Sequence, residues 1–259
     1  MHRPVLEAEV LRYLEPRPGG VFVDGTLGDG GHAAGVAAAI HPGGRLLALD
    51  RDAEAVRRVL ARGADWLGCC TVVQGNFADL AVVARVHGFE RVDGVLLDLG
   101  VSSAQLEDAG RGFSFLRDGP LDMRMDRTQG TTAADLVNTL DEGALAELLH
   151  RYGEEPQARR IARAIVRERA RAPFTGTGQL ADLVARVCGG RRGRPHPATR
   201  TFQALRIAVN DELAALERAL ESGLALLKPG GRMAVIAFHS LEDRQVKQCF
   251  RRHAGHWES

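Results

Sequence analysis

The segment Val21-Phe-Val-Asp-Gly-Thr-Leu-Gly-Asp-Gly-Gly-His32 decides the fold. Its apolar start is typical of a short buried strand, which ends at Asp24. Four glycines between positions 25 and 31 then allow tight turns, and a helical pattern begins at Gly31. A strand, a glycine-rich turn and a helix in this order are typical of sites that bind a nucleotide-like ligand at the helix N-terminus.

Further strands and helices alternate on the carboxyl side of this segment. Apolar runs near 46–50, 71–74 and 92–98 are separated by helical patterns near 31–40, 53–62 and 78–87. Strands that alternate with helices pair in parallel through right-handed crossovers, so we predict a doubly wound α/β sheet. The pattern resumes with a long helix over 201–227, a turn at 228–231, a strand over 233–238 and a last helix after Ser240.

Residues 104–204 interrupt this alternation. A stretch rich in Gly, Asp and Arg over 106–130 lacks clear periodicity, and helical patterns follow near 142–152, 156–171 and 178–187. We therefore predict an all-helical insertion over 104–204 within a sheet domain formed by 1–103 and 205–259. The charge of this insertion, described next, is the reason to interpret it as an RNA-binding domain.

The composition of the 259 residues, 45% hydrophobic and 26% charged, is that of a folded globular protein and excludes disorder. The net charge is +1, but residues 151–207 carry 13 arginines against 4 acidic residues. Arginine binds phosphate in a bidentate way, so RNA is one interpretation, and a solvated helix face is the other. The arginines concerned are Arg159, Arg160, Arg163, Arg167, Arg169, Arg171 and those of the loop Arg191-Arg-Gly-Arg194.

The sequence predicts neither a metal site nor a membrane segment. Its four cysteines show no CxxC spacing, which argues against a zinc ribbon or a disulfide scaffold. No uncharged apolar run reaches 18 residues, and Glu7 and Glu9 stand near the start of the chain. We expect a cytoplasmic protein without a membrane partner.

Acidic residues around the glycine turn indicate the ligand. Asp50 ends the second strand about twenty residues after the turn, where a carboxylate can accept hydrogen bonds from two ribose hydroxyls. Asp24 can bind an amino group or order the turn. Because the turn lacks GxGxxG spacing, S-adenosylmethionine is favoured over a dinucleotide, although a turn without a ligand is the structural alternative. Phe77 follows the third strand and could contact adenine or belong to the core.

The fourth strand ends in Asp98-Leu-Gly-Val-Ser-Ser103 at the same sheet edge. An exocyclic amine on a base must rehybridise before it attacks a methyl group, and an acceptor for its protons promotes that change. Asp98 is therefore the candidate catalytic residue, with binding of the methionyl amino group or capping of the turn as alternatives. Methylation at carbon 5 would require a cysteine nucleophile, commonly one that follows a proline, and none of the four does.

Seven ordered motifs resemble the bacterial 16S rRNA (cytosine-N4) methyltransferases. They are His2-Arg-Pro-Val-Leu6, 24–32, 93–105, Arg111-Gly-Phe-Ser-Phe115, Tyr152-Gly-Glu-Glu155, 201–213 and Phe238-His-Ser-Leu-Glu-Asp-Arg244. The resemblance implies a Rossmann-like methyltransferase sheet with a helical insertion, S-adenosylmethionine as cofactor, and methylation of a decoding-centre cytidine in the small ribosomal subunit. It also implies cofactor contacts by Gly30, Gly31, His32, Asp50, Phe77, Asp98 and Gln105.

The sequence departs from related patterns in two places. Leu99, Gly100 and Val101 replace the prolines and aromatic of general amino-methyltransferases, so the ring that stacks on the base is expected elsewhere. Phe113 and Phe115 are candidates, with a buried pair as the alternative. The family continues beyond the last helix into a strand pair, so we expect an open sheet edge beside the last strand. A second hypothesis follows, in which the protein is an RNA-binding assembly protein that retains the fold but has weakened catalysis.

Overall fold

A computed structural model describes residues 4–190 and 196–254, which form two compact units. The sheet unit comprises residues 1–100 and 213–259, and the helical unit comprises 101–212. The predicted junction at 204/205 falls inside α10 (Thr199–Asn210), whose Phe202, Ala204 and Leu205 are buried in the core of the helical unit. The motif around His2 and the loop Arg191–Arg194 lie partly or wholly outside the described residues.

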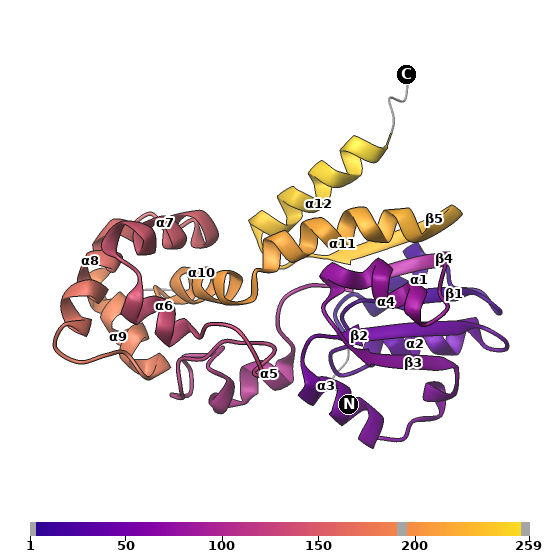
Figure 1. Cartoon of the computed structure of the whole chain (residues 1–259), viewed down its shortest axis with the longest axis horizontal. Coiled ribbons are helices and arrows are strands. Elements are labelled where there is room, and N and C mark those ends of the chain that lie inside the picture. The colour runs from indigo at the N-terminus through magenta and orange to yellow at the C-terminus, as the bar shows by residue number, and fades with distance from the viewer. Residues whose placement is uncertain (1–3, 191–195, 255–259) are drawn as a thin grey trace. The chain divides into compact units, whose positions relative to one another are not determined.

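The sheet unit contains five parallel strands in the order β3-β2-β1-β4-β5 (Figure 1). They are β1 (Val21–Asp24), β2 (Arg45–Asp50), β3 (Cys70–Gln74), β4 (Val92–Asp98) and β5 (Leu227–Ile236). The order runs outward from β1 to β3 on one side and from β4 to β5 on the other. The topological switch point therefore lies between β1 and β4, where doubly wound sheets bind their ligands.

Alternate side chains of the strands build a core on each face of this sheet. Phe22, Leu46 and Leu96 pack with α1 (Glu7–Leu14), α2 (Gly31–Ile40) and α3 (Ala53–Ala61). Val23, Leu47 and Val95 pack with α4 (Leu80–Val86), α11 (Glu212–Leu226) and α12 (Ser240–His253). Burial of both faces confirms the predicted doubly wound α/β fold. None of the described helices combines the length and apolarity needed to cross a bilayer.

The predicted single helix over 201–227 is wrong. Asp211 has a φ of 50°, in the left-handed region, and this residue separates α10 from α11. The helical pattern continues on both sides of it, so periodicity alone does not reveal the break. Just beyond, the side chain of Glu212 accepts two hydrogen bonds from Arg206, at 2.9 and 2.8 Å.

The predicted turn at 228–231 lies inside β5 as a bulge. Leu227 pairs with Val92 and Arg232 pairs with Gly94, so the residues between them oppose Asp93 alone. Lys228 Nζ lies 2.9 Å from both oxygens of Asp93, and Asp93 also accepts the Val21 N–H. These bonds hold the bulge at the start of β4, away from the carboxyl edge.

The regular elements described in the helical unit are all helices, as predicted, apart from an isolated antiparallel bridge between Pro120 and Gly176. The other helices of this unit are α5 (Ser103–Glu107), α6 (Ala133–Thr139), α7 (Glu142–Gly153), α8 (Ala158–Arg169) and α9 (Thr177–Val187). A short 3₁₀ turn spans Ala109–Arg111 in this unit. In the sheet unit, similar turns span Asp65–Cys69 and Phe77–Asp79. The aperiodic stretch before α6 is held by Arg111, which is 2% exposed and donates to the carbonyl oxygens of Arg124 and Met125.

Asn210 fixes the same stretch from α10. Its Oδ1 accepts the Met125 N–H at 2.8 Å, and its Nδ2 donates to the Met123 and Arg206 carbonyls at 2.8 and 2.9 Å. Met123 is fully buried and has a φ of 64°, which an L-residue adopts only where its surroundings impose it.

We predict that Asn210→Ala lowers the free energy of unfolding by about 2–4 kcal/mol, because it leaves buried backbone groups without partners. Urea denaturation measures this loss, and amide exchange at Met125 localises it. Gln129→Ala is the matched control, because it removes an exposed amide that donates to Asp126 on the surface and should cost under about 0.5 kcal/mol. An equal loss in both variants would contradict the role of Asn210.

Candidate active site

Three aspartates meet at the carboxyl edge of the sheet. Asp24 ends β1, Asp50 ends β2 and Asp98 ends β4, so they surround the switch point between β1 and β4. All three belong to the sheet unit. The strand order therefore brings together acidic residues that are far apart in the chain.

Asp24 is the most buried of the three, with 1% of its surface exposed. Its Oδ1 accepts the Thr26 N–H at 2.9 Å and the Thr26 hydroxyl at 3.2 Å, while its buried Oδ2 has no hydrogen-bond partner in the described chain. Burial, together with the charge of Asp98, raises the pKa of Asp24 to about 7. Thr26 Oγ1 also accepts the Asp98 N–H at 2.6 Å, so this hydroxyl links β1 to β4.

Asp50 orders the glycine turn. Its Oδ2 accepts the Gly28 N–H at 2.7 Å, and its Oδ1 accepts the Asp52 N–H at 2.8 Å. Burial raises the pKa of Asp50 to about 6, although both hydrogen bonds act in the opposite direction. Because a carboxylate oxygen has two lone pairs, each oxygen of Asp50 can accept a second donor.

Asp98 lies close to His32. The distance from His32 Nε2 to Asp98 Oδ2 is 3.6 Å, which is longer than a hydrogen bond, and Asp98 Oδ1 is buried without a partner among the described residues. Burial and the charge of Glu242 raise the pKa of Asp98 to about 6, and burial lowers the pKa of His32. The imidazole is therefore neutral at physiological pH and does not neutralise Asp98.

Gly30 and Gly31 join the turn to α2. Gly30 has a φ of 81°, and a Cβ there would lie 3.1 Å from the Trp66 ring. A Cβ on Gly31 would lie 2.9 Å from the Pro4 side chain. Glycine is thus required by the fold at both positions, independently of any ligand.

Phe77 and Gln105 both take part in local structure. Phe77 is half-buried at the start of a 3₁₀ turn and packs against the core on the α4 side of the sheet. Gln105 lies in the helical unit, is 6% exposed, and its Oε1 accepts the Ser102 N–H at 2.9 Å in a capping box. A contact of either side chain with the cofactor stays a prediction.

The two rings predicted as possible base-stacking groups lie within the helical unit. Phe113 is 7% exposed. Phe115 packs between Phe202 and His196, with ring centroids 4.8 and 4.6 Å away. Packing in the core, the alternative given above, describes both side chains.

The arginines of α8 and the residues after it divide into two groups. Arg169 donates to the Val137 carbonyl at 2.6 Å, Arg160 donates to the Val187 carbonyl at 3.0 Å, and Arg163 pairs with Glu142. The side chains of the other three are exposed and make no hydrogen bond or ion pair with the described part of the chain; these residues are Arg159, Arg167 and Arg171. Only the second group is free to bind phosphate.

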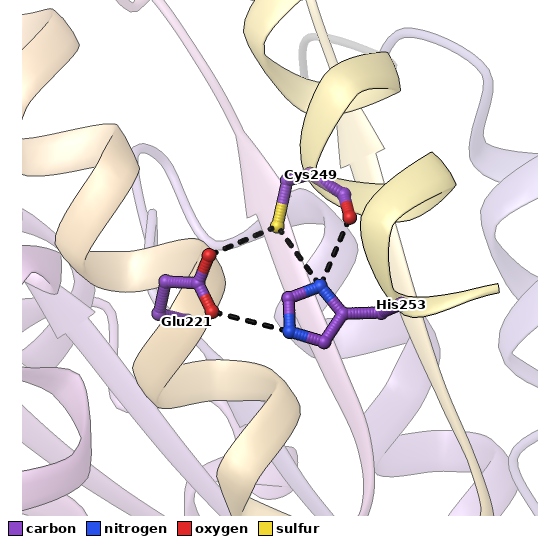
Figure 2. Close-up of side chains that lie close together, drawn as sticks. All are labelled: Glu221, Cys249 and His253. Atoms are coloured by element: carbon purple, nitrogen blue, oxygen red, sulfur yellow. Dashed lines mark hydrogen bonds and ion pairs between the residues drawn. The ribbon is translucent and has the colours of Figure 1, made fainter. Parts of the chain in front are cut away.

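Three side chains of types that bind zinc lie together on α11 and α12, namely Glu221, Cys249 and His253 (Figure 2). Glu221 already lies 3.0 Å from Arg252 Nη2 and 3.2 Å from His253 Nε2. His253 Nδ1 lies 2.9 Å from the Cys249 carbonyl oxygen. These contacts explain the cluster as a polar link between the two helices.

Comparison with known proteins identifies the family. The model of the MraW methylase family matches residues 1–258. The chain belongs to this family. It is 56% identical to the ribosomal RNA small subunit methyltransferase H of Thermomicrobium roseum over 98% of this chain and 78% of that protein. It is also 56% identical to the protein of the same name from Geobacter sulfurreducens, over 98% of this chain and 82% of that protein.

Membership of the MraW methylase family confirms the predicted resemblance and the methyltransferase class, with S-adenosylmethionine as cofactor. The sheet edge fits that cofactor. S-Adenosylmethionine carries an ammonium and a sulfonium group, and the edge offers one buried and two partly buried carboxylates with raised pKa values. Two of them, Asp24 and Asp98, have an oxygen without a partner among the described residues. A cationic ligand stabilises the charged form of such groups.

Thr26 and Glu242 were not singled out as site residues by sequence reasoning. Thr26 lies within the glycine turn, and only the β1–β4 pairing shows that its hydroxyl reaches the Asp98 N–H. Glu242 is 3% exposed and its charge raises the pKa of Asp98. In the sequence, Glu242 stood out only as part of the motif Phe238–Arg244, for which we predicted no chemical role.

We predict that the cofactor-free protein loses stability as the pH rises from about 4 to about 7. The folded-state pKa values of Asp24, Asp50 and Asp98, about 7, 6 and 6, exceed the ordinary value of 3.8, so the folded state binds protons more readily than the unfolded state across this range. Asp24→Asn should flatten the decline, measured by urea unfolding at several pH values. Glu90→Gln, at an exposed position, should leave the slope unchanged, and an unchanged slope in Asp24→Asn would contradict the assignment.

Proposed function

We propose that this protein transfers a methyl group from S-adenosylmethionine to N4 of a decoding-centre cytidine in 16S rRNA of the small ribosomal subunit. The observation that carries this function is the set of three carboxylates, Asp24 buried and Asp50 and Asp98 partly buried, at the switch point of a chain that belongs to the MraW methylase family. Its relatives are named as small-subunit rRNA methyltransferases. Because small subunits are cytoplasmic, we place the activity there.

The glycine turn and the strand ends would hold the cofactor. Asp50 accepts hydrogen bonds from the ribose hydroxyls through the lone pairs that Gly28 and Asp52 leave free. Gly30, Gly31 and His32 border the cofactor at the N-terminus of α2. Phe77 lies against the adenine, and Asp98 and Gln105 contact the methionyl part.

At the reacting atoms, Asp98 is the proposed catalytic residue. The cofactor supplies an electrophilic methyl group on sulfur. The N4 amine is conjugated with the cytosine ring, and a hydrogen bond from its N–H to Asp98 Oδ1 favours rehybridisation of the nitrogen. As the nitrogen–carbon bond forms and the sulfur–carbon bond breaks, the nitrogen gives up a proton. The raised pKa of Asp98 makes its carboxylate a stronger acceptor for that proton.

We predict that Asp98→Ala lowers kcat at saturating cofactor by about 100-fold or more, because it removes the acceptor for the amine protons. The assay incubates the protein with S-adenosylmethionine and small subunits from cells that lack the endogenous enzyme, and measures N4-methylcytidine by nucleoside mass spectrometry. Glu90→Gln, at an exposed position, is the control and should retain full activity.

The same assay tests the function itself. Absence of N4-methylcytidine with a folded, cofactor-binding wild-type protein would contradict the proposal and favour the assembly-protein hypothesis. Formation of the product by Asp98→Ala at the wild-type rate would retain the function but remove Asp98 from the catalytic step.

The three unpaired arginines after and within α8 would bind phosphates of the RNA. Arg159, Arg167 and Arg171 lie on one short segment. Their guanidinium groups have no partner in the described chain, so they can bind phosphate without first breaking an ion pair. The paired arginines of the same segment stabilise the helical unit instead.

We predict that changing Arg159, Arg167 and Arg171 together to Gln weakens binding to small subunits. The slope of log affinity against log salt concentration should fall in magnitude by about 2 to 3, since each lost phosphate contact removes roughly 0.7–0.9. Filter binding at several salt concentrations measures the slope. A triple change of exposed arginines in the sheet unit, Arg57, Arg85 and Arg251 to Gln, alters the net charge equally and is the control. Equal slopes for the α8 variant and the wild type would remove these residues from the RNA interface.

A further inference from the structure

The chain that leaves β5 places an aromatic ring at the edge where Asp98 ends β4. Asp98 pairs in register with Ile236, and the Leu99 N–H donates to the Ile236 carbonyl at 3.0 Å. Phe238 follows two residues later, just beyond the end of β5. Adjacent strands lie about 4.8 Å apart and two residues span about 7 Å, so Phe238 is within one nucleotide's reach of Asp98.

The ring of Phe238 is exposed although its backbone is fixed. Its relative exposure is 55%. Its N–H donates to Glu242 Oε2 at 2.9 Å, and Glu242 is itself 3% exposed. His239 Nε2 lies 3.0 Å from the other oxygen of Glu242, and the His239 ring caps α12. An exposed ring on a fixed backbone is pre-organised to receive a flat ligand.

The other aromatic side chains named so far are poor candidates for stacking on a base. Phe113 and Phe115 pack in the helical core. In the described part of the sheet unit, two aromatic side chains are more than half exposed, Phe238 and Tyr13. The Tyr13 carbonyl accepts a hydrogen bond from Arg232, which pairs with Gly94 near the start of β4, at the edge opposite to Asp98. Phe238 is therefore the exposed ring at the edge that carries the carboxylates.

We propose that Phe238 forms the base-binding subsite, on whose ring the acceptor cytosine stacks while its N4 amine faces Asp98. This inference rests on the proposed function for the identity of the base. Every base has a flat π face, so the ring supplies affinity and orientation, and Asp98 supplies the contact to the amine. Glu242 is a positioning residue, because it binds the backbone of Phe238 and acts on Asp98 through its charge.

Substitution of Phe238 tests this subsite by activity. Phe238→Leu keeps an apolar side chain but removes the π face, and we expect kcat/KM for small subunits to fall by about 5- to 150-fold. The Kd for S-adenosylmethionine and the melting temperature should not change, because the ring is exposed and lies outside the proposed cofactor contacts. Phe238→Trp should retain activity, and Tyr13→Leu is the matched control for the loss of an exposed ring.

A binding measurement makes the test independent of turnover. A short single-stranded RNA with one pyrrolocytidine reports stacking as fluorescence quenching on the cofactor-bound protein, and Phe238→Leu should lose that quenching while Tyr13→Leu retains it. Equal kcat/KM in Phe238→Leu and wild type, equal quenching in both, or absence of quenching in the wild type would each overturn the subsite. Quenching that depends on Phe238, in a wild-type protein that forms no N4-methylcytidine, would support the subsite while refuting the proposed function.

Discussion

The partial or complete removal of three carboxylates from water at one edge of one sheet is the constraint on which the rest of the site depends. Desolvation raises the pKa of each, and the charge of Asp98 adds to the effect on Asp24. The surrounding backbone offsets part of this cost through N–H groups of Thr26, Gly28 and Asp52. The site is thus arranged for a cation, since a positive ligand stabilises charges that the protein alone stabilises incompletely.

The glycine turn follows from the same constraint. Gly28 must present its N–H to Asp50 and has a φ of 52°, while Gly30 begins α2 with a φ of 81° close to Trp66. The loop conformation is further fixed at Asp29, whose carbonyl accepts a hydrogen bond from Arg62 at 2.7 Å. A loop shaped in this way places the N-terminus of α2 beside the carboxyl end of β1, where the cofactor is proposed to bind.

The sequence allowed prediction of those features that depend on local pattern. The five strands and the helices between them were found because buried parallel strands read as apolar runs and the connecting helices follow the 3.6-residue period. The break at Asp211 was missed because one left-handed residue does not disturb that period. Asp24, Asp50 and Asp98 were found because each ends a strand. The position of Phe238 and Glu242 near Asp98 was not predicted. It follows from the pairing of β4 with β5, two strands that are separated in the sequence by the whole helical unit.

In the reaction that we propose, the partial burial of Asp98 is useful because of the same raised pKa that makes it unfavourable for the fold. In water a carboxylate is a weak proton acceptor, whereas the raised pKa of Asp98, about 6, brings its basicity closer to neutrality. His32 lies 3.6 Å away but stays neutral because burial lowers its pKa, so it does not reduce that basicity as an imidazolium would. Glu242 adds a second negative charge nearby and raises the pKa of Asp98 further. These neighbours of Asp98 therefore leave its pKa raised, which is what the proposed role of accepting the protons of an amine requires.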